Sequence, residues 1–303
     1  MFGAESLDIT GLLELGMTVR KPSSRKERPM EGRVGKEGML NLDELRGIKV
    51  RVAGWKELSL VDIIGEPSFT IWFNYCNLRC PWCQNSHVVK GEVSMEVEVG
   101  ELVDLIKENS KLVKYVHATG GEPTLQPDGL EALFLLSKQV GEKTSLSTNG
   151  TNFEVIKKIV EELDHLALDL KGPITDPKRY AYITGSNPSD CIEMTKAIDS
   201  SLRLGMDNVP FVEVRTTLVP SLLNSEEVLN LAEYISDLAY DSTNRVVYVI
   251  QQYIPSETLI DQRFRNVEKT PASLLIKLGK TIKERTLLKE VYVRAIELGT
   301  VKV

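Results

Sequence analysis

The sequence predicts an α/β protein whose fold is a partial (β/α)6-type barrel, similar to a TIM barrel, with an N-terminal extension. A chain of 303 residues with 42% apolar residues can bury one large core. After about Val52, short runs of β-branched and aromatic residues alternate with longer stretches of helical period. Such repeated βα units favour a parallel sheet with right-handed crossover helices on its outside.

The individual elements follow one another along the chain. Strands are predicted at residues 69–73, 115–118, 144–148, 165–170, 212–219, 246–253 and 291–296. Helices are predicted at residues 97–109, 129–140, 152–162, 191–204, 225–238 and 271–284. A sheet of this kind can curl into a complete or partial barrel, whose chemistry lies in the loops at the carboxyl ends of its strands.

The chain is expected to divide into an N-terminal extension, residues 1–51, and one barrel domain, residues 52–303. Residues 20–36 read RKPSSRKERPMEGRVGK, which is rich in basic residues, Pro, Gly and Ser and has no periodic apolar face. We interpret this segment as a loop or flexible arm. A solvated linker is the favoured explanation, and contact with an acidic partner is the alternative.

Composition and charge argue against several classes of protein. The formal net charge of −6 repels a nucleic-acid backbone, and no long basic segment offers a groove for one. No apolar run reaches the roughly 18 to 20 residues of a membrane span, and the N-terminus has no signal-peptide pattern. With only four cysteines, a disulfide framework is not expected. We therefore expect a cytoplasmic protein with no membrane or nucleic-acid partner.

The motif richest in metal-binding side chains is FNYCNLRCPWCQN, at the end of the first predicted strand. Cys76, Cys80 and Cys83 have the spacing C-x3-C-x2-C, so three thiolates can converge on one metal centre. A 4Fe-4S cluster held by three cysteines leaves one iron without a protein ligand and open to a substrate. Zinc, with His87 as a fourth ligand, and a chance group of core cysteines are less favoured. Cys191 begins a predicted helix, where a buried apolar role is expected.

The motif CNLRCPWC resembles that of the radical S-adenosylmethionine (radical SAM) superfamily, and the resemblance extends from about Leu58 to Tyr253. Within it the chain is similar to glycyl-radical-enzyme activating proteins, above all those of anaerobic ribonucleoside-triphosphate reductase and more distantly pyruvate formate-lyase activases. The resemblance implies two cofactors, a 4Fe-4S cluster and S-adenosyl-L-methionine (SAM), whose amino and carboxylate groups chelate the open iron. Electron transfer to the sulfonium then releases a 5′-deoxyadenosyl radical.

The second predicted strand ends in HATGGEPTLQ, which is similar to the superfamily's GGE motif. Gly120 and Gly121 let the backbone approach a ligand closely, and Glu122 supplies a carboxylate. The resemblance implies that this motif hydrogen-bonds the methionine ammonium of SAM. By itself Gly-Gly-Glu-Pro is a common turn, but its position one βα unit after the cysteines favours the functional interpretation.

Further cofactor contacts are implied at the ends of the later strands. The residues that match cofactor-binding positions of the activases are Trp82, Ser147, Asn149, Asp169, Lys171, Arg215 and Gln252. Ser147 stands where the family frequently has an acidic residue, so the binding of a monovalent cation stays open. Asp169 and Lys171 are explained equally well as a local ion pair, and Gln252 nearly as well as polar filling of a barrel. Gln84 replaces a common histidine, which removes no ligand.

The resemblance implies that the radical abstracts a Cα hydrogen from a glycine of a partner, a glycyl radical enzyme such as anaerobic ribonucleotide reductase. A flavodoxin or ferredoxin is the expected electron donor, because the sequence has no second cysteine cluster. No residue beyond the cluster and SAM is expected to be catalytic, since no acid–base or nucleophilic triad is apparent. Two alternatives stay open: a radical SAM enzyme that modifies a small molecule or a tRNA base, and a non-catalytic zinc-binding module.

Overall fold

A sheet of ten strands runs through residues 41–303, the part of the chain that the computed structural model describes. The strands lie in the order β10-β9-β8-β7-β6-β5-β4-β2-β1-β3. Neighbours from β2 to β9 are parallel, whereas β1, β3 and β10 pair antiparallel with their neighbours. The strands are β1 (Lys49–Ile63), β2 (Glu66–Phe73), β3 (Met95–Glu98), β4 (Tyr115–Gly120), β5 (Lys143–Thr148), β6 (His165–Asp169), β7 (Phe211–Leu218), β8 (Arg245–Gln252), β9 (Glu290–Ala295) and β10 (Gly299–Lys302).

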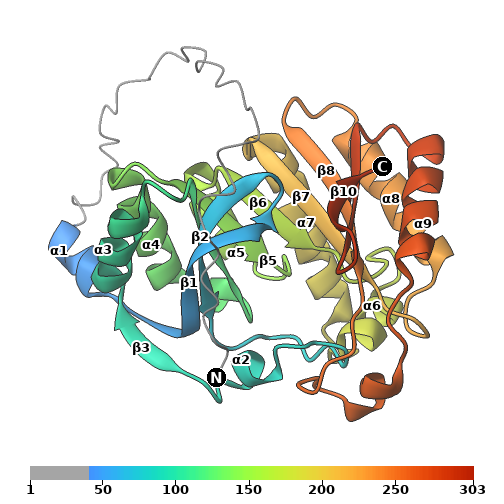
Figure 1. Ribbon diagram of the computed structural model, residues 1–303, viewed down its shortest axis with the longest axis horizontal. Coiled ribbons are helices and arrows are strands. Elements are labelled where there is room, and N and C mark those ends of the chain that lie inside the picture. Colours follow the sequence, from blue (N-terminus) through green and yellow to red (C-terminus); the bar gives the residue numbers. More distant parts are fainter. Residues whose placement is uncertain (1–40) are drawn as a thin grey trace, which may run out of the picture. The chain divides into compact units, whose positions relative to one another are not determined.

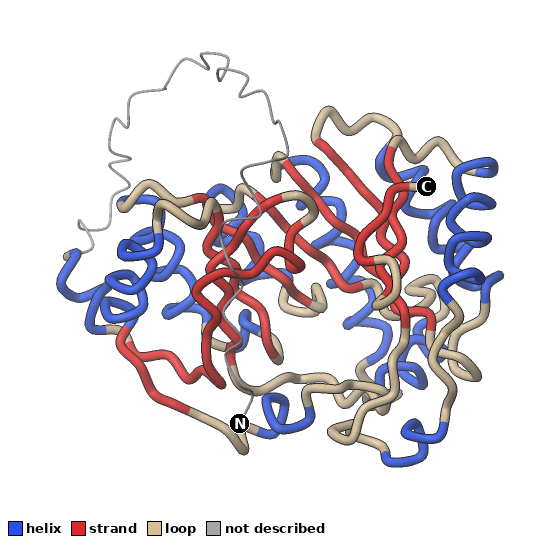
Figure 2. The backbone as a smooth tube through the Cα atoms, viewed as in Figure 1, coloured by secondary structure: helices blue, strands red, loops and turns tan. Residues whose placement is uncertain are grey.

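Helices connect the parallel strands and lie on the outside of the sheet (Figures 1 and 2). The helices are α1 (Leu42–Gly47), α2 (Ser86–Lys90), α3 (Val99–Asn109), α4 (Pro127–Gln139), α5 (Phe153–Ile159), α6 (Pro177–Thr184), α7 (Cys191–Asn208), α8 (Ser225–Ala239) and α9 (Ala272–Arg285), with short 3-10 turns at Pro123–Leu125, Val160–Glu162 and Gln262–Asn266. Each parallel strand pairs with the next one along the chain, so the sheet curls in one direction. Within residues 41–303, no helix is both long enough and apolar enough to cross a bilayer.

The predicted fold class is confirmed, and every predicted strand and helix has a counterpart in the described residues. The sequence interpretation missed α1, α2, α6 and the three antiparallel strands β1, β3 and β10. The division expected at residue 51 falls inside β1, where Val50 and Val52 are buried in the large apolar cluster between the sheet and the helices. That division stays a prediction, because most of the extension, including residues 20–36, lies outside the described residues.

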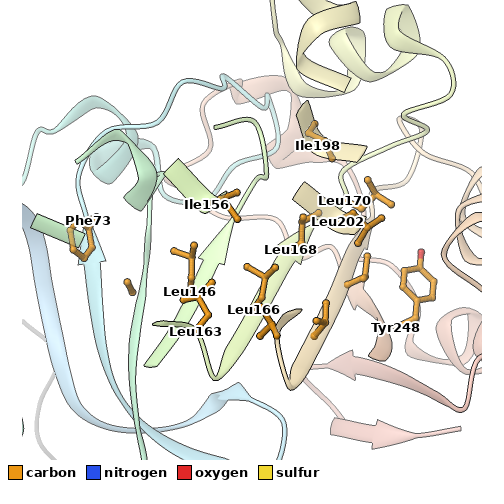
Figure 3. Close-up of a cluster of buried hydrophobic side chains, with 14 of the residues drawn as sticks. Phe73, Leu146, Ile156, Leu163, Leu166, Leu168, Leu170, Ile198, Leu202 and Tyr248 are labelled. Carbon is orange, nitrogen blue, oxygen red and sulfur yellow. The ribbon is translucent and has the colours of Figure 1, made fainter. Parts of the chain in front are cut away.

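The larger of two apolar clusters lies between the sheet and the helices. Leu146 and Leu166 on neighbouring strands face Ile156 and Ile198 on the helices that cover them (Figure 3). The opposite, concave face of the strands carries polar side chains, which are listed here: Thr70, His117, Ser145, His165, Glu213 and Arg215. A closed TIM barrel fills this space with branched apolar residues. Here the concave face combines these polar side chains with a second, smaller apolar cluster of Ile63, Tyr115, Phe211, Val247 and Val249, and the cavity lies at the carboxyl ends of the strands.

Candidate active site

The loop that carries the three cysteines joins β2 to α2 and is held by backbone hydrogen bonds from two sides. The Glu122 N–H at the end of β4 donates to the Tyr75 carbonyl at 2.7 Å, and the Ile260 N–H donates to the Cys83 carbonyl at 3.2 Å. Tyr75 itself has a φ of 70°, a conformation that is uncommon outside glycine. A Cβ added to Gly121 would lie 1.9 Å from the Tyr75 carbonyl oxygen. The loop can therefore occupy this position only because residue 121 is glycine.

The three loop cysteines are free thiols that line one cavity of about 1050 Å³. Burial raises the pKa of Cys76 to about 11 and that of Cys80 to about 12, while the nearby Lys171 ammonium lowers both. Burial also raises the pKa of Cys83. The thiols are therefore protonated at neutral pH in the free protein, so binding of metal must release protons. Within residues 41–303, no three His, Cys, Asp or Glu side chains are grouped so as to hold a single metal ion.

Lys171 supplies a positive charge beside the cysteine loop. Its Nζ donates to Asp169 Oδ2 at 3.1 Å and lies 5.7 Å from the centre of the Trp82 ring. Burial opposes the charged form, but the Asp169 carboxylate and further neighbouring groups, among them Cys80, together outweigh burial and raise the pKa of Lys171. The buried Trp82 Nε1 has no hydrogen-bond partner among the described residues. The side chains that line the cavity here are Lys171, Asp169, Trp82 and Ser147, so the structure brings these four predicted site residues together.

The GGE motif divides its residues between the cavity wall and the interior. Gly120 and Gly121 line the cavity, and a Cβ on Gly120 would lie 2.4 Å from the Phe73 carbonyl oxygen, so Gly120 allows close approach of the end of β2 and Gly121 that of the cysteine loop. Glu122 is fully buried, and its carboxylate accepts hydrogen bonds from the Thr148 hydroxyl at 2.7 Å and the Asn149 N–H at 2.8 Å. The Glu122 carboxylate is therefore engaged with the loop after β5, and its contact with SAM stays a prediction.

Arg215 lies on the cavity wall and is held by a carboxylate that the sequence interpretation missed. Arg215 Nε donates to Glu213 Oε2 at 2.9 Å, and Arg215 Nη2 lies 2.8 Å from the same oxygen. Glu213 Oε1 accepts from the Ile64 N–H at 2.8 Å, which ties this pair to the end of the β1–β2 hairpin. The Arg215 guanidinium also stabilises the ionised form of Glu213, and it lowers the pKa of that carboxyl despite the burial that opposes ionisation.

A second arginine was also missed, and it faces the same cavity from β9. Arg294 Nη2 lies 3.6 Å from Glu213 Oε2, beyond hydrogen-bond distance, and this buried nitrogen has no hydrogen-bond partner among the described residues. Burial and the neighbouring Arg215 lower the pKa of Arg294 to about 10. The sequence did indicate Glu213 as a partner of Arg215, since the two residues are two positions apart on one strand and therefore share a face. No local pattern marks Arg294.

Two further predicted site residues, Gln252 and Asn149, lie on the cavity wall, and their side chains are hydrogen-bonded within the protein. The Gln252 amide donates to the Thr270 carbonyl at 2.8 Å and to Glu297 Oε2 at 3.0 Å. Asn149 contacts the cysteine loop itself. Cys191 is buried at the start of α7 and does not line the cavity, so it lies apart from the three loop cysteines.

The sequence profile of the Radical SAM superfamily matches residues 70–235, more than half of the chain. The chain belongs to this superfamily. It is therefore an enzyme of the radical SAM type, and its cofactors are a 4Fe-4S cluster and SAM. The residues present fit these groups: three thiols share one cavity wall, a lysine beside them can balance thiolate charge, and a buried indole N–H is free to donate.

Relatives within the superfamily have different functions. A protein of Methanocaldococcus jannaschii named as a glycyl-radical enzyme activating enzyme is 28% identical, over 78% of this chain and 93% of the relative. The pyruvate formate-lyase-activating enzyme of Clostridium pasteurianum is 26% identical, over 77% of this chain and 97% of the relative. A protein of Pyrococcus horikoshii named as a GTP 3′,8-cyclase is 28% identical, over 75% of this chain and 71% of the relative.

The fold is similar to that of a solved structure. Streptococcus suis SuiB, in its crystal structure with S-adenosylmethionine, matches 73% of this chain with a TM-score of 0.54 and 16% sequence identity. This chain matches 48% of that protein, so it spans about half of its length. At this level of identity the comparison concerns the fold, the curved parallel sheet with outer helices.

Proposed function

We propose that this enzyme is an activating protein that generates a glycyl radical on a partner enzyme. The iron–sulfur cluster is held by Cys76, Cys80 and Cys83. The observation that carries the proposal is the single cavity onto which these thiols open, because all of the predicted SAM-contact residues except Glu122 line the same space. The enzyme works in the reducing cytoplasm, where free thiols persist.

When bound, the cluster and SAM together supply a primary carbon radical by one-electron reduction. The chain's own residues bind and orient these groups. The Lys171 ammonium balances thiolate charge, and the Trp82 indole N–H is a free donor on the cavity wall. The backbone of Gly120 and Gly121 forms the wall beside the cysteine loop. Electrons come from a flavodoxin or ferredoxin.

The rim of the cavity also supports a protein as the radical acceptor. The cavity volume of about 1050 Å³ lies just above the range of roughly 300 to 1,000 Å³ that is usual for small-ligand pockets, and the cluster and SAM would share this space. Exposed apolar side chains of Leu60, Val61 and Ile296 form part of its rim. A partner segment that carries a glycine could reach the cofactors across this rim.

The relatives support an activating protein over a nucleotide cyclase. The match covers nearly all of the M. jannaschii and C. pasteurianum activating enzymes, 93% and 97%, but 71% of the P. horikoshii cyclase. The proposed partner is a glycyl radical enzyme such as anaerobic ribonucleotide reductase.

A second candidate is modification of an anionic small molecule. One observation favours it: the Arg294 guanidinium on the cavity wall has a buried nitrogen without a partner, and arginine binds carboxylates and phosphates well. The similarity to the cyclase is compatible with this candidate.

One experiment distinguishes these functions. The full chain is loaded anaerobically with iron and sulfide, reduced, and mixed with SAM and either a glycyl radical enzyme or GTP. Formation of 5′-deoxyadenosine together with a glycyl radical signal on the protein partner supports the proposal. Formation of 5′-deoxyadenosine that is stimulated by GTP alone would support the second candidate. Stoichiometric zinc with no cleavage of SAM would refute both.

A further inference from the structure

Asn149 lies at the start of the loop after β5, and its side-chain amide is bonded at both ends. Its Oδ1 accepts from the Thr151 N–H at 3.0 Å and from the Thr151 hydroxyl at 2.7 Å. Its Nδ2 donates to Asn77 Oδ1 at 2.9 Å and lies 3.8 Å from the Cys76 sulfur. The residue is 4% exposed. The polar atoms of this side chain are therefore occupied by the protein, and its donor faces the cysteine loop.

The hydrogen-bond partners of this amide determine which end carries the oxygen and which the nitrogen, because the two ends have nearly the same shape. Asn77 Nδ2 donates to Thr151 Oγ1 at 2.7 Å, which leaves Asn77 Oδ1 as the acceptor that faces Asn149. Rotating the Asn149 amide by half a turn would place two oxygens against each other and lose both hydrogen bonds from Thr151. The network thus directs an N–H group, and not a carbonyl, toward Cys76.

Asn149 is also fixed through its backbone, which separates it from an ordinary loop residue. Its N–H donates to Glu122 Oε2 at 2.8 Å, and the preceding Thr148 hydroxyl donates to Glu122 Oε1 at 2.7 Å. Glu122 is fully buried next to the glycines that hold the cysteine loop. The same carboxylate therefore links the loop after β5 to the strand end that supports the cysteines.

We propose that Asn149 is a positioning residue for the iron–sulfur cluster, not a contact to SAM. Its N–H group directs the Cys76 thiolate and, with the Leu78 N–H at 3.4 Å from the same sulfur, makes the cluster easier to reduce. Hydrogen bonds to cluster sulfurs raise the reduction potential because they stabilise the more negative, reduced form. The inference rests on the part of the proposed function that assigns the cluster to the three cysteines.

The test measures the cluster in the absence of SAM, so that a contact to SAM cannot contribute. The full chain and its Asn149→Ala and Asn149→Asp variants are loaded anaerobically and poised at one potential, and the reduced fraction is measured by electron paramagnetic resonance. Loss of one hydrogen bond to a charged sulfur should lower the ratio of reduced to oxidised cluster by about fivefold in the alanine variant. Asn149→Asp retains the size and the contacts with Thr151 but replaces the donor with a charged oxygen, so its ratio should fall further.

The matched control is Asn152→Ala on the same loop. Asn152 Nδ2 donates to the Thr124 carbonyl at 3.0 Å, away from the cysteine sulfurs, and removal of that bond should leave the ratio within about twofold of wild type. A second measurement does not depend on how much cluster each variant takes up. In the reduced wild-type protein, exchangeable protons coupled to the cluster should be detectable, and after Asn149→Asp the coupling of the Asn149 amide should disappear while that of the Leu78 N–H remains.

The possible results separate this inference from the proposed function. An unchanged ratio in both Asn149 variants, together with weaker binding of SAM, would overturn the inference and assign Asn149 to SAM, while the cluster assignment would stand. A wild-type protein that takes up no cluster would overturn the cluster assignment and the inference with it. Lower ratios in both variants and an unchanged Asn152→Ala control support the inference.

Discussion

Replacing Gly121 with alanine tests how tightly the end of β4 meets the cysteine loop. The added Cβ would lie 1.9 Å from the Tyr75 carbonyl oxygen and 2.5 Å from the Tyr75 carbonyl carbon, whereas real Cβ atoms essentially never approach closer than 3.0 Å. One of the two backbones must therefore move by about 1 Å, because neither atom belongs to a flexible side chain.

The expected cost of this change can be estimated from the structure. Overpacking costs about 1 to 3 kcal/mol. The displacement also weakens the hydrogen bond from the Glu122 N–H to the Tyr75 carbonyl and that from the Gly121 N–H to the Phe73 carbonyl, each worth about 1 kcal/mol. We expect the free energy of unfolding to fall by about 3 to 5 kcal/mol in total, and iron uptake to fall because the loop is displaced.

Urea unfolding of the apo protein and iron content after anaerobic loading measure these two effects separately. Gly47→Ala is the matched control, because its added Cβ would meet nothing within 4 Å and Gly47 has no positive φ. The control should stay within about 0.5 kcal/mol of wild type. If Gly121→Ala is as stable as this control and loads the same amount of iron, the close approach of the two backbones is not required, and the explanation of the glycine is wrong.

Three further predictions concern other buried groups. Cys80→Ala should prevent cluster assembly, whereas Cys191→Ala, in the core at the start of α7, should load normally; equal iron-to-protein ratios would contradict the ligand assignment. Glu213→Gln should lower the free energy of unfolding in urea by about 3 to 5 kcal/mol, because it leaves the buried Arg215 without its ion-pair partner; a loss below about 1 kcal/mol would argue against this pair. Acid should destabilise the fold because burial lowers the pKa of His117: the unfolded chain takes up a proton below pH 6.5 that the folded protein does not. This contribution is complete above pH 6.5 and is lost at up to about 1.4 kcal/mol per pH unit as the pH falls, so His117→Gln should flatten the measured dependence.

Some of the site could be predicted because its signals are local. The three loop cysteines share one short segment, so their convergence requires no knowledge of the sheet. Each further motif follows a strand whose alternating or apolar pattern identified it, and parallel strands bring their carboxyl ends to one edge. Strand β1 was not predicted for a different reason. Its buried positions do not alternate regularly, because the strand changes register against β2 between Val52 and Ile63.

The sequence by itself determined the class of fold, the cysteine loop and the strand ends that surround it, because hydrophobic period and residue spacing act over a few neighbouring residues. Tertiary structure alone decided which side chains meet. Arg294 reaches the carboxylate of Glu213 across β8, and the Asn149 amide faces Cys76 from a different strand end. Such contacts depend on the register between strands, the curl of the sheet and the direction of each side chain. Local sequence patterns determine none of these, so the partners of Glu122 and Asn149 could be identified only from the assembled sheet.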